Sequence, residues 1–508
     1  MYLAFCYNKV VIQYPGLIIM SQYNKKHQLL FIIIILALLA GSCDQIPMSD
    51  PGLQSTSVLV QTIPPATLTA ISAAQEPSQT PVPEPMGLPW SSVEGLELNF
   101  WYVWDLDQPD TGMNAIVDRF NQENQWGIVV NPVDQGLVLD PLDSMEMAFE
   151  EGIVPHLLLS DASTIASWYQ DGLTLDLTPF LDDPAAGIPV KDQNDYYSGL
   201  LDGFTIAGSI RPGIPFSQAI QVIYYNQSWA GELGYSTPPN SGQDLEEQAC
   251  SAAGDRELSA SSQVQATGIL LSPEAANIVS AAYAYNGSFF SLEGHGYLFN
   301  TPEIRQVAED WQSLLRQGCG MTFYAYPDPM SSELSFEYFN QRKTMMMLGS
   351  SQMMDYVDTG ANQTGRADDW EMLPFIGPEG KKAVSSEIQS IVIFNTSSEE
   401  ELASWLFLNY LTSPEVQAEW AQYSRYYPIR KSSLRLLRDF RTENPHWSQG
   451  LNLLKYSIGI PLDPSWNTVK LSIGDAFEEI LIDGTLDVED QLLALDQLAA
   501  ELWEYTRE

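Results

Sequence analysis

The chain has 508 residues, of which 45% are hydrophobic, and it contains 13 Trp, 24 Tyr and 19 Phe. This composition supports large buried cores and excludes a protein that is disordered throughout. The 65 Asp and Glu outnumber the 23 Lys and Arg, which gives a formal net charge of -42. A field of this sign repels phosphate backbones, so the composition excludes a nucleic-acid-binding protein.

The first residues predict export. Lys25 and Lys26 precede an apolar run, residues 29–40, that is too short to span a bilayer comfortably. The run leads through two small residues to Cys43, and this order resembles the bacterial lipobox, in which the cysteine is lipidated and becomes the mature N-terminus. We therefore predict a signal peptide over residues 1–42, and a start at Met20 would leave residues 1–19 untranslated. An ordinary secretory signal, which Cys43 merely follows, is the alternative.

Residues 43–94 are predicted to form a disordered tether between the lipidated Cys43 and the folded part of the chain. Up to about Ser92 the segment is rich in Pro, Ser, Thr, Ala and Gln and poor in aromatic residues. Such a segment buries too little apolar surface to offset its conformational entropy, and its prolines keep it semi-extended.

Two cysteines remain once the signal is removed and Cys43 is lipidated, namely Cys250 and Cys319. An even pair of cysteines in an exported protein indicates a disulfide. A cross-link that closes a loop of about 70 residues would stabilise the folded protein by roughly 4 kcal/mol in the chain-entropy model. Two free buried thiols are the alternative.

No Cys-x-x-Cys or His-rich spacing indicates zinc, and we predict no metal site. A calcium ion at Asp105, Asp107 and Asp110 is the alternative, although Pro109 breaks the spacing of an EF-hand loop.

Beyond Val93 the sequence alternates apolar strands with amphipathic helices. Residues 96–104 predict a strand, and the helix after it has Met113, Ile116, Val117 and Phe120 on one face. Short apolar runs at 128–130 and 157–159 are typical of buried parallel strands, and residues 220–225 predict a further strand. This alternation predicts an α/β protein, and its length favours two lobes over one core.

Several helix starts carry recognisable capping residues. Ser272, Thr301 and Ser413 each precede a Pro-Glu pair, which places a hydroxyl at the N-cap, Pro at the first helical position and an acid in the first turn. Ser398 and Glu401 match a capping box ahead of an apolar run. Trp311, Trp405 and Trp420 lie on amphipathic helices, which predicts that they are core residues.

Catalytic and cofactor motifs are missing. The sequence contains no phosphate-binding Gly-x-x-x-x-Gly-Lys loop, no dinucleotide-binding Gly-x-Gly-x-x-Gly turn, no His-Glu-x-x-His helix and no Gly-x-Ser-x-Gly elbow. We therefore predict a protein that is not an enzyme and that uses no cofactor.

A set of short motifs instead recurs in one order over residues 95–508. These motifs include Asp171-Gly172-Leu173, Gly213-Ile214-Pro215-Phe216, Phe299-Asn300-Thr301-Pro302-Glu303 and Pro464-Ser465-Trp466. In this order they resemble the extracellular solute-binding proteins of ABC importers, specifically the family that includes maltose- and oligosaccharide-binding proteins.

The resemblance implies a two-lobe α/β fold of the periplasmic-binding-protein type, with a ligand cleft between the lobes. Lobe one would comprise residues 95–222 and 388–430, and lobe two residues 223–387 and 431–508. The family fold would place Cys250 and Cys319 together in lobe two, and we predict that they are bonded.

Ligands of open α/β sheets lie beyond the carboxyl ends of strands. That rule, together with the crossing segments of the family fold, selects the following ligand-binding candidates: Trp104, Asp105, Asp161, Tyr225, Tyr285, Asn286, Ser350, Gln389, Tyr426 and Trp466. Many relatives carry a Gly-Gly or Gly-Ser turn where this chain has Glu387-Ile388-Gln389-Ser390, so Glu387 or Gln389 is in a position to reach the ligand.

The expected function is that of a monomeric receptor, lipid-anchored at the extracellular face of the bacterial cell membrane. It would capture a neutral solute, with a sugar or oligosaccharide as the expected class, and hand it to the permease subunits of an ABC transporter. Two alternatives remain open: the binding module of a sensor that does not transport, and a secreted glycan-degrading enzyme.

Overall fold

The computed structural model describes residues 83–102, 111–135, 148, 153–206, 209–255, 266–290, 296–323, 330–364, 368–459 and 462–507. The chain divides into two compact units, Met1–Gln79 and Thr80–Glu508, and every described residue belongs to the second. The predicted signal peptide, the predicted lipidation residue Cys43 and the candidates Trp104 and Asp105 lie outside the described residues. In the part of the chain that is described, no helix combines the length and apolar character needed to cross a membrane.

The strands of the described residues form one hydrogen-bonded path in the order β2-β1-β3-β10-β4-β7-β5-β6. Short strands β8 and β11 pair with β4, and β9 and β12 pair with β10. The strand bounds are β1 (Glu97–Tyr102), β2 (Val129–Asp134), β3 (Leu157–Asp161), β4 (Ile214–Asn226), β5 (Thr267–Leu271), β6 (Gly320–Thr322), β7 (Thr344–Ser350), β8 (Trp370–Leu373), β9 (Phe375–Ile376), β10 (Lys382–Ile393), β11 (Tyr427–Pro428) and β12 (Ser457–Gly459).

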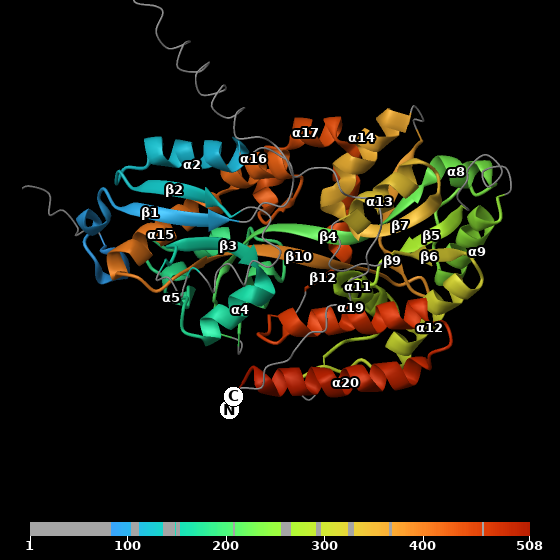
Figure 1. Ribbon diagram of the computed structural model, residues 1–508. Coiled ribbons are helices and arrows are strands. Elements are labelled where there is room, and N and C mark those ends of the chain that lie inside the picture. Colours follow the sequence, from blue (N-terminus) through green and yellow to red (C-terminus); the bar gives the residue numbers. More distant parts are fainter. Residues whose placement is uncertain are drawn as a thin grey trace, which may run out of the picture. The chain divides into compact units, whose positions relative to one another are not determined.

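The long strands β4 and β10 lie side by side near the middle of this path (Figure 1). They pair with each other in antiparallel fashion, from Ser386 opposite Ile220 to Ile391 opposite Ile214. On one side β10 pairs with β3, and on the other β4 pairs with β7, so both strands run between a parallel β1–β2–β3 group and a parallel β5–β6–β7 group. Every residue of β4 is buried, because a strand in the middle of an α/β sheet is covered on both faces.

The helices lie between the strands, as the alternation of the sequence predicts. Their bounds are α2 (Thr111–Glu123), α4 (Ala162–Gln170), α5 (Thr178–Leu181), α6 (Val190–Gln193), α7 (Leu200–Gly203), α8 (Gln227–Glu232), α9 (Gly242–Ala253), α11 (Ala275–Ala284), α12 (Pro302–Arg316), α13 (Met330–Asn340), α14 (Met354–Thr364), α15 (Ser398–Leu411), α16 (Pro414–Ser424), α17 (Arg438–Glu443), α18 (Pro445–Leu453), α19 (Trp466–Ile482) and α20 (Val488–Tyr505). Short 3-10 helices occur as η1 (Pro85–Gly87), η2 (Trp90–Val93), η3 (Ser351–Met353), η4 (Lys431–Arg435) and η5 (Leu454–Tyr456).

Two of the predicted helix starts are confirmed. The Thr301 side chain accepts from the backbone N–H of Ile304 at the start of α12, and Ser413 caps α16 in the same way. Two other starts are displaced. Glu274 rather than Ser272 occupies the N-cap of α11, and the capping box of α15 joins Ser397 to Glu400, one residue before the predicted pair.

Buried apolar side chains gather into two large clusters, which we call the first core and the second core. The first core draws on residues 93–216 and 391–429, and the second on residues 223–383 and 466–499. A smaller central cluster joins β4 and β10 to residues 418–453. Trp405 and Trp420 lie in the first core and Trp311 in the second, which confirms the three as core residues. We propose that the first and second cores mark the two lobes expected from the sequence.

The end of the predicted tether is folded. Residues 85–93 form η1 and η2, Val93 is part of the first core, and the Trp90 ring stacks on Trp126 with centroids 5.6 Å apart. The backbone N–H of Met86 donates to the carboxylate of Asp183 at 2.8 Å. The difference has a simple cause: Trp90 and Val93 supply apolar surface that the rest of the Pro-rich segment lacks.

The predicted disulfide is confirmed. Cys250 of α9 and Cys319, which follows α12, are bonded with their Cα atoms 4.4 Å apart. The bond fastens α9 to the sheet at a point of close approach, because a Cβ atom added to Gly268 of β5 would lie 1.9 Å from the carbonyl oxygen of Ala249.

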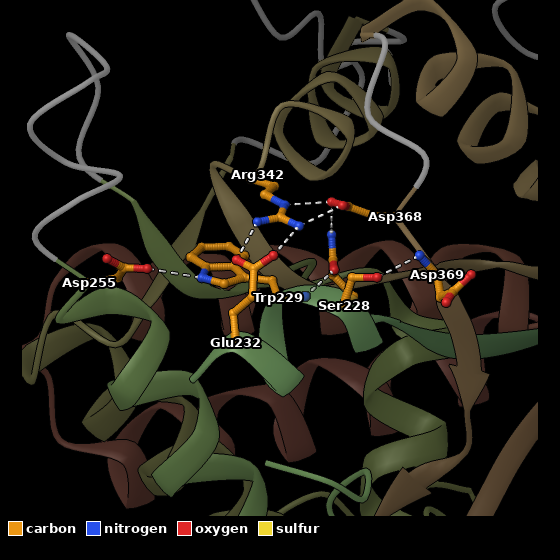
Figure 2. A network of polar contacts seen from close by, with 8 residues as sticks. Ser228, Trp229, Glu232, Asp255, Arg342, Asp368 and Asp369 are labelled. Atoms are coloured by element: carbon orange, nitrogen blue, oxygen red, sulfur yellow. Dashed lines mark hydrogen bonds and ion pairs between the residues drawn. The ribbon is translucent and has the colours of Figure 1, made fainter. Parts of the chain in front are cut away.

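Charged residues also tie elements of the second core together (Figure 2). Arg342 donates in bidentate fashion to Asp368, with both distances 2.6 Å, and to Glu232 at 2.7 and 3.0 Å. Asn226, the N-cap of α8, donates to the same Asp368 carboxylate at 2.9 Å. All the donors and acceptors named are used within the protein, so the network ties α8 to the segment before β7 and the segment before β8.

Candidate ligand-binding site

The burial of β10 is interrupted where it crosses from the second core to the first. Residues 383–386 and 390–393 are buried, whereas Glu387, Ile388 and Gln389 between them are half-exposed. Two neighbouring strands also reach solvent at their carboxyl ends, β3 at Ser160 and Asp161 and β7 at Gly349 and Ser350. Water therefore reaches the sheet at this crossing, which is the place where ligands of open α/β sheets bind.

Polar side chains of β4 and β10 face one another at the crossing. Ser217 donates its hydroxyl proton to Gln389 Oε1 at 2.8 Å, and Gln221 Nε2 donates to Glu387 Oε1 at 2.7 Å. Ser350, at the end of β7, donates to the second carboxylate oxygen of Glu387 at 3.3 Å. The alternation of β-strands puts residues 217 and 221, and residues 387 and 389, on one face of the sheet. We call these five residues the crossing cluster.

Asp161 of β3 extends the crossing cluster, because it lies directly opposite Gln389. Its Oδ1 accepts from the backbone N–H of Thr164 at 3.0 Å, and its Oδ2 lies 3.6 Å from Lys470 Nζ. Lys470 belongs to α19, whose Asn467 donates to the Thr164 hydroxyl at 3.3 Å. The carboxyl end of β3 therefore meets α19 of the second core at the crossing.

Two carboxyl groups at the crossing have raised pKa values. Burial raises the pKa of Glu387 above its usual value, and the charge of Asp161 acts in the same direction, against hydrogen bonds from Gln221 and Ser350 and the charge of Lys470. Burial and the charge of Glu387 raise the pKa of Glu274, at the N-cap of α11, to about 7. The Glu274 side chain keeps contact with solvent, so water screening limits the energetic cost of that shift.

Comparison with known protein families identifies the fold. Residues 115–448 match the model of the family described as bacterial extracellular solute-binding protein, which is more than half of the chain. The chain belongs to this family. Membership confirms the predicted family and agrees with the expectation of a binding protein rather than an enzyme. A search of curated protein sequences finds no match.

Solved structures show the same periplasmic-binding-protein-like fold. The cyclic alpha-maltosyl-1,6-maltose binding protein of Arthrobacter globiformis is 18% identical, with a TM-score of 0.66, and the match covers 81% of this chain and 99% of that one. The sugar-binding protein MalE of Xanthomonas citri gives 18% identity, a TM-score of 0.66 and coverages of 81% and 98%. The ABC substrate-binding protein Lmo0181 of Listeria monocytogenes, in complex with cycloalternan, is 16% identical with a TM-score of 0.65, and the match covers 80% of this chain and 99% of that one.

The crossing of this solute-binding protein brings together three of the candidates chosen from the sequence, Asp161, Ser350 and Gln389, with Glu387 beside them. Ser217, Gln221, Glu274 and Lys470 were not among the candidates. The run Ser217-Gln218-Ala219-Ile220-Gln221 shows no regular alternation that would have selected Ser217 and Gln221. The packing of α11 and α19, which no local pattern encodes, brings Glu274 and Lys470 to the crossing.

Three aromatic candidates lie in the interior instead. Tyr225 is 1% exposed and donates to Gln248 at 2.8 Å, and Trp466 is 2% exposed with its ring 5.8 Å from that of Tyr297. Tyr426 is also buried. Both faces of the sheet are covered, so an aromatic residue near a strand end can pack into a core rather than face the crossing.

Tyr285 and Asn286 lie at the far end of α11 from Glu274. A helix of this length separates its ends by about 15 Å, so these two residues are remote from the crossing. Tyr285 donates to Asp310 at 2.9 Å and lines a pocket of about 290 Å³ in the second core, and Asn286 has the positive φ of 68° that ends the helix. The pocket walls are mostly core side chains of one cluster, such as Ile269 and Trp311, so we place the ligand site at the crossing. In the described residues, no group of His, Cys, Asp and Glu is arranged to hold a metal ion.

Proposed function

We propose that this protein is the lipid-anchored substrate-binding component of an ABC importer, which captures a carbohydrate outside the cell and delivers it to permease subunits in the membrane. The observation that carries the proposal is the crossing cluster. Half-exposed polar side chains interrupt an otherwise buried strand at the point where β4 and β10 connect the two cores.

Carbohydrate suits these side chains. Glu387 and Asp161 offer carboxylate oxygens to sugar hydroxyls, and the amide of Gln389 can both donate and accept. Among the similar structures, one is named as a cyclic alpha-maltosyl-1,6-maltose binding protein, and Lmo0181 is in complex with cycloalternan. A third, UgpB of Mycobacterium tuberculosis in complex with glycerophosphocholine, has the same fold at 16% identity, so the fold also accepts other polar solutes.

Binding would be coupled to a hinge motion. The crossing strands are continuous between the cores, and small changes of φ and ψ along them can move one lobe relative to the other. A ligand that bridges the two lobes stabilises the closed state by the contacts that only this state provides.

Calorimetric titration of the exported protein against a panel of mono- and oligosaccharides tests the binding function. We expect saturable binding, with every sugar recovered unchanged by chromatography. Gln389→Ala should weaken binding about tenfold, since a hydrogen bond to the ligand contributes about 1 kcal/mol or more. Gln449→Ala is the matched control, because Gln449 donates to Glu371 on β8, away from the crossing. Hydrolysed sugar in the chromatogram would refute a binding protein.

Replacement of Cys43 tests the anchor. Cys43→Ser should release the protein from the membrane fraction into the medium, because lipidation needs the thiol. Unchanged membrane association of the variant would show that another segment holds the protein to the cell.

Uptake of a labelled ligand tests the transport role. Deletion of the gene should abolish uptake at ligand concentrations near the dissociation constant, and the wild-type chain should restore it. Normal uptake in the deletion strain would remove the importer assignment and leave a sensing role.

A further inference from the structure

Acidic side chains outnumber basic ones at the crossing, counted over the residues that the structure describes. Carboxylates come from three separate elements, Glu387 of β10, Asp161 of β3 and Glu274 at the start of α11, and each acts electrostatically on at least one of the others. In the described part of the chain, the cation that acts on Glu387 is Lys470, and Lys470 already lies 3.6 Å from Asp161. Among the described residues, the crossing therefore sets three carboxyl groups against one lysine.

Glu387 itself is held by neutral donors. Its oxygens accept from the Gln221 amide at 2.7 Å and from the Ser350 hydroxyl at 3.3 Å, and within the described residues its carboxylate makes no direct ion pair. Elsewhere in the protein a buried acid is matched directly by a cation: Asp368 receives two hydrogen bonds from Arg342. Two neutral donors replace the lost hydration of a carboxylate only in part.

Gln221 adds a second, independent demand for a donor. Its side chain is 1% exposed, its Nε2 is used by Glu387, and its Oε1 accepts no hydrogen bond in the structure. The same amide group donates to Glu387, so Gln221 offers the crossing cluster an unused acceptor. A buried acceptor without a donor destabilises the folded protein, so a ligand that supplies the donor gains the free energy of that hydrogen bond.

Three groups at this point of the crossing can accept a hydrogen bond from a ligand: the Glu387 and Glu274 carboxyl groups and the unpaired oxygen of Gln221. A sugar hydroxyl both donates and accepts, so it uses only half of its capacity against such a surface. An ammonium group has three donors and no acceptor, and its hydrogen bonds to carboxylates are roughly twice as strong as neutral ones.

We propose that the ligand is an aminated carbohydrate, whose positively charged amino group binds between Glu387, Gln221 and Glu274. This inference rests on the proposed carbohydrate-binding function and sharpens it, and it replaces the neutral solute expected from the sequence. The strongly acidic chain would also raise the local concentration of such a cation.

Matched sugars test the inference. Calorimetry compares glucosamine oligosaccharides with N-acetylglucosamine oligosaccharides of the same length, which differ in the charge of the amino group, and with maltose as an unrelated neutral sugar. The aminated sugar should bind at least tenfold more tightly than its acetylated partner. Glu387→Gln keeps the shape and removes the charge, so it should weaken binding of the aminated sugar by roughly ten- to a hundredfold and leave neutral sugars nearly unchanged.

A second variant separates the site from a general effect of charge. Glu371→Gln removes a half-buried carboxylate of β8 that is hydrogen-bonded to Gln449, and it should preserve the preference for the aminated sugar. Thermal unfolding of both variants verifies that they are folded.

The outcomes are distinguishable. Equal or tighter binding of neutral sugars by the wild type overturns the amino-group inference but leaves the carbohydrate receptor intact. An equal loss of both sugars in Glu387→Gln also overturns it, because the charge would then contribute no selectivity. Absence of binding by every sugar, charged or neutral, overturns the proposed carbohydrate function together with the inference.

Discussion

Removal of the Cys250–Cys319 disulfide should destabilise the second core selectively. The bond joins residues 69 apart in sequence, and it connects the outer helix α9 to the chain just before β6. Cys319 is 5% exposed, and its carbonyl oxygen accepts from the backbone N–H groups of Gly268 and Ile269 at 2.9 and 3.1 Å. The cross-link therefore holds α9 against the β5–β6 edge of the sheet.

The expected magnitude follows from the loop. Closing a loop with a sequence separation of 69 lowers the entropy of the unfolded chain by about 15 cal/mol/K, which corresponds to about 4.4 kcal/mol at 25 °C. The variant Cys250→Ala with Cys319→Ala should lose about this free energy of unfolding, with a smaller additional loss from the missing sulfur contacts.

Denaturant unfolding followed by tryptophan fluorescence and circular dichroism measures the loss. Because a chain of this length need not unfold in one step, hydrogen exchange should accompany it and locate the loss in α9, β5 and β6. Each single Ala variant serves as the control, since either one breaks the same bond. A loss below about 1 kcal/mol, or a loss of protection in β1 and α15 of the first core, would refute the reasoning.

Three further predictions follow from buried groups. Burial raises the pKa of Glu387, so its ionisation lowers the free energy of unfolding once the pH exceeds about 4.3, the usual pKa of Glu. Glu387→Gln should therefore raise the melting temperature at about pH 7 and leave it unchanged at or below about pH 4. Arg342→Ala leaves Asp368, with its side chain 17% exposed, without its cation and should cost about 3 kcal/mol in denaturant unfolding, whereas Arg342→Lys should cost less. Trp466→Ala should lower the free energy of unfolding by about 3–5 kcal/mol, and calorimetry should find ligand affinity nearly unchanged in the folded fraction, because the ring is 2% exposed within the second core.

Local signals in the sequence predict much of the fold. The starts of α12 and α16 follow from a hydroxyl residue, Pro and Glu in succession, a pattern whose physics involves only four neighbouring residues. The capping box of α15 shows the limit of such signals. Two serines precede three consecutive glutamates, so Ser397 with Glu400 and Ser398 with Glu401 satisfy the same pattern, and the backbone chooses the first pair.

The predicted start of α11 is wrong for a different reason. Ser272, Pro273 and Glu274 match the pattern, but Glu274 adopts an extended conformation with φ -62° and ψ 137°, and the helix begins at Ala275. In this position Glu274 is acted on by the charge of Glu387. Tertiary structure overrides the local preference at a candidate functional residue, which is where such conflicts are expected.

The candidate site could be predicted only in part. The rule that ligands lie beyond strand ends selects backbone positions, and it selected Asp161 and Ser350, which the structure places at the crossing. The rule does not say which face of a covered sheet a side chain enters, so it also selected Tyr225 and Trp466, which pack in the second core. An aromatic residue has more to gain from burial than from water contact, and the sequence alone does not distinguish the two environments.

Two glutamines of β4 separate a structural role from a ligand-binding one. Gln218 and Gln221 are both almost completely buried, at 2% and 1% exposure. Gln218 donates to the carbonyl oxygen of Pro428 and thereby supports the pairing of β11, whereas Gln221 directs its donor at a carboxylate and leaves its acceptor unpaired. A structural role would favour an apolar residue at position 221, because burying an unpaired amide oxygen costs stability that no contact within the described residues restores. A ligand that carries several donors restores it, and for this reason we assign the polar face of the crossing to binding rather than to folding.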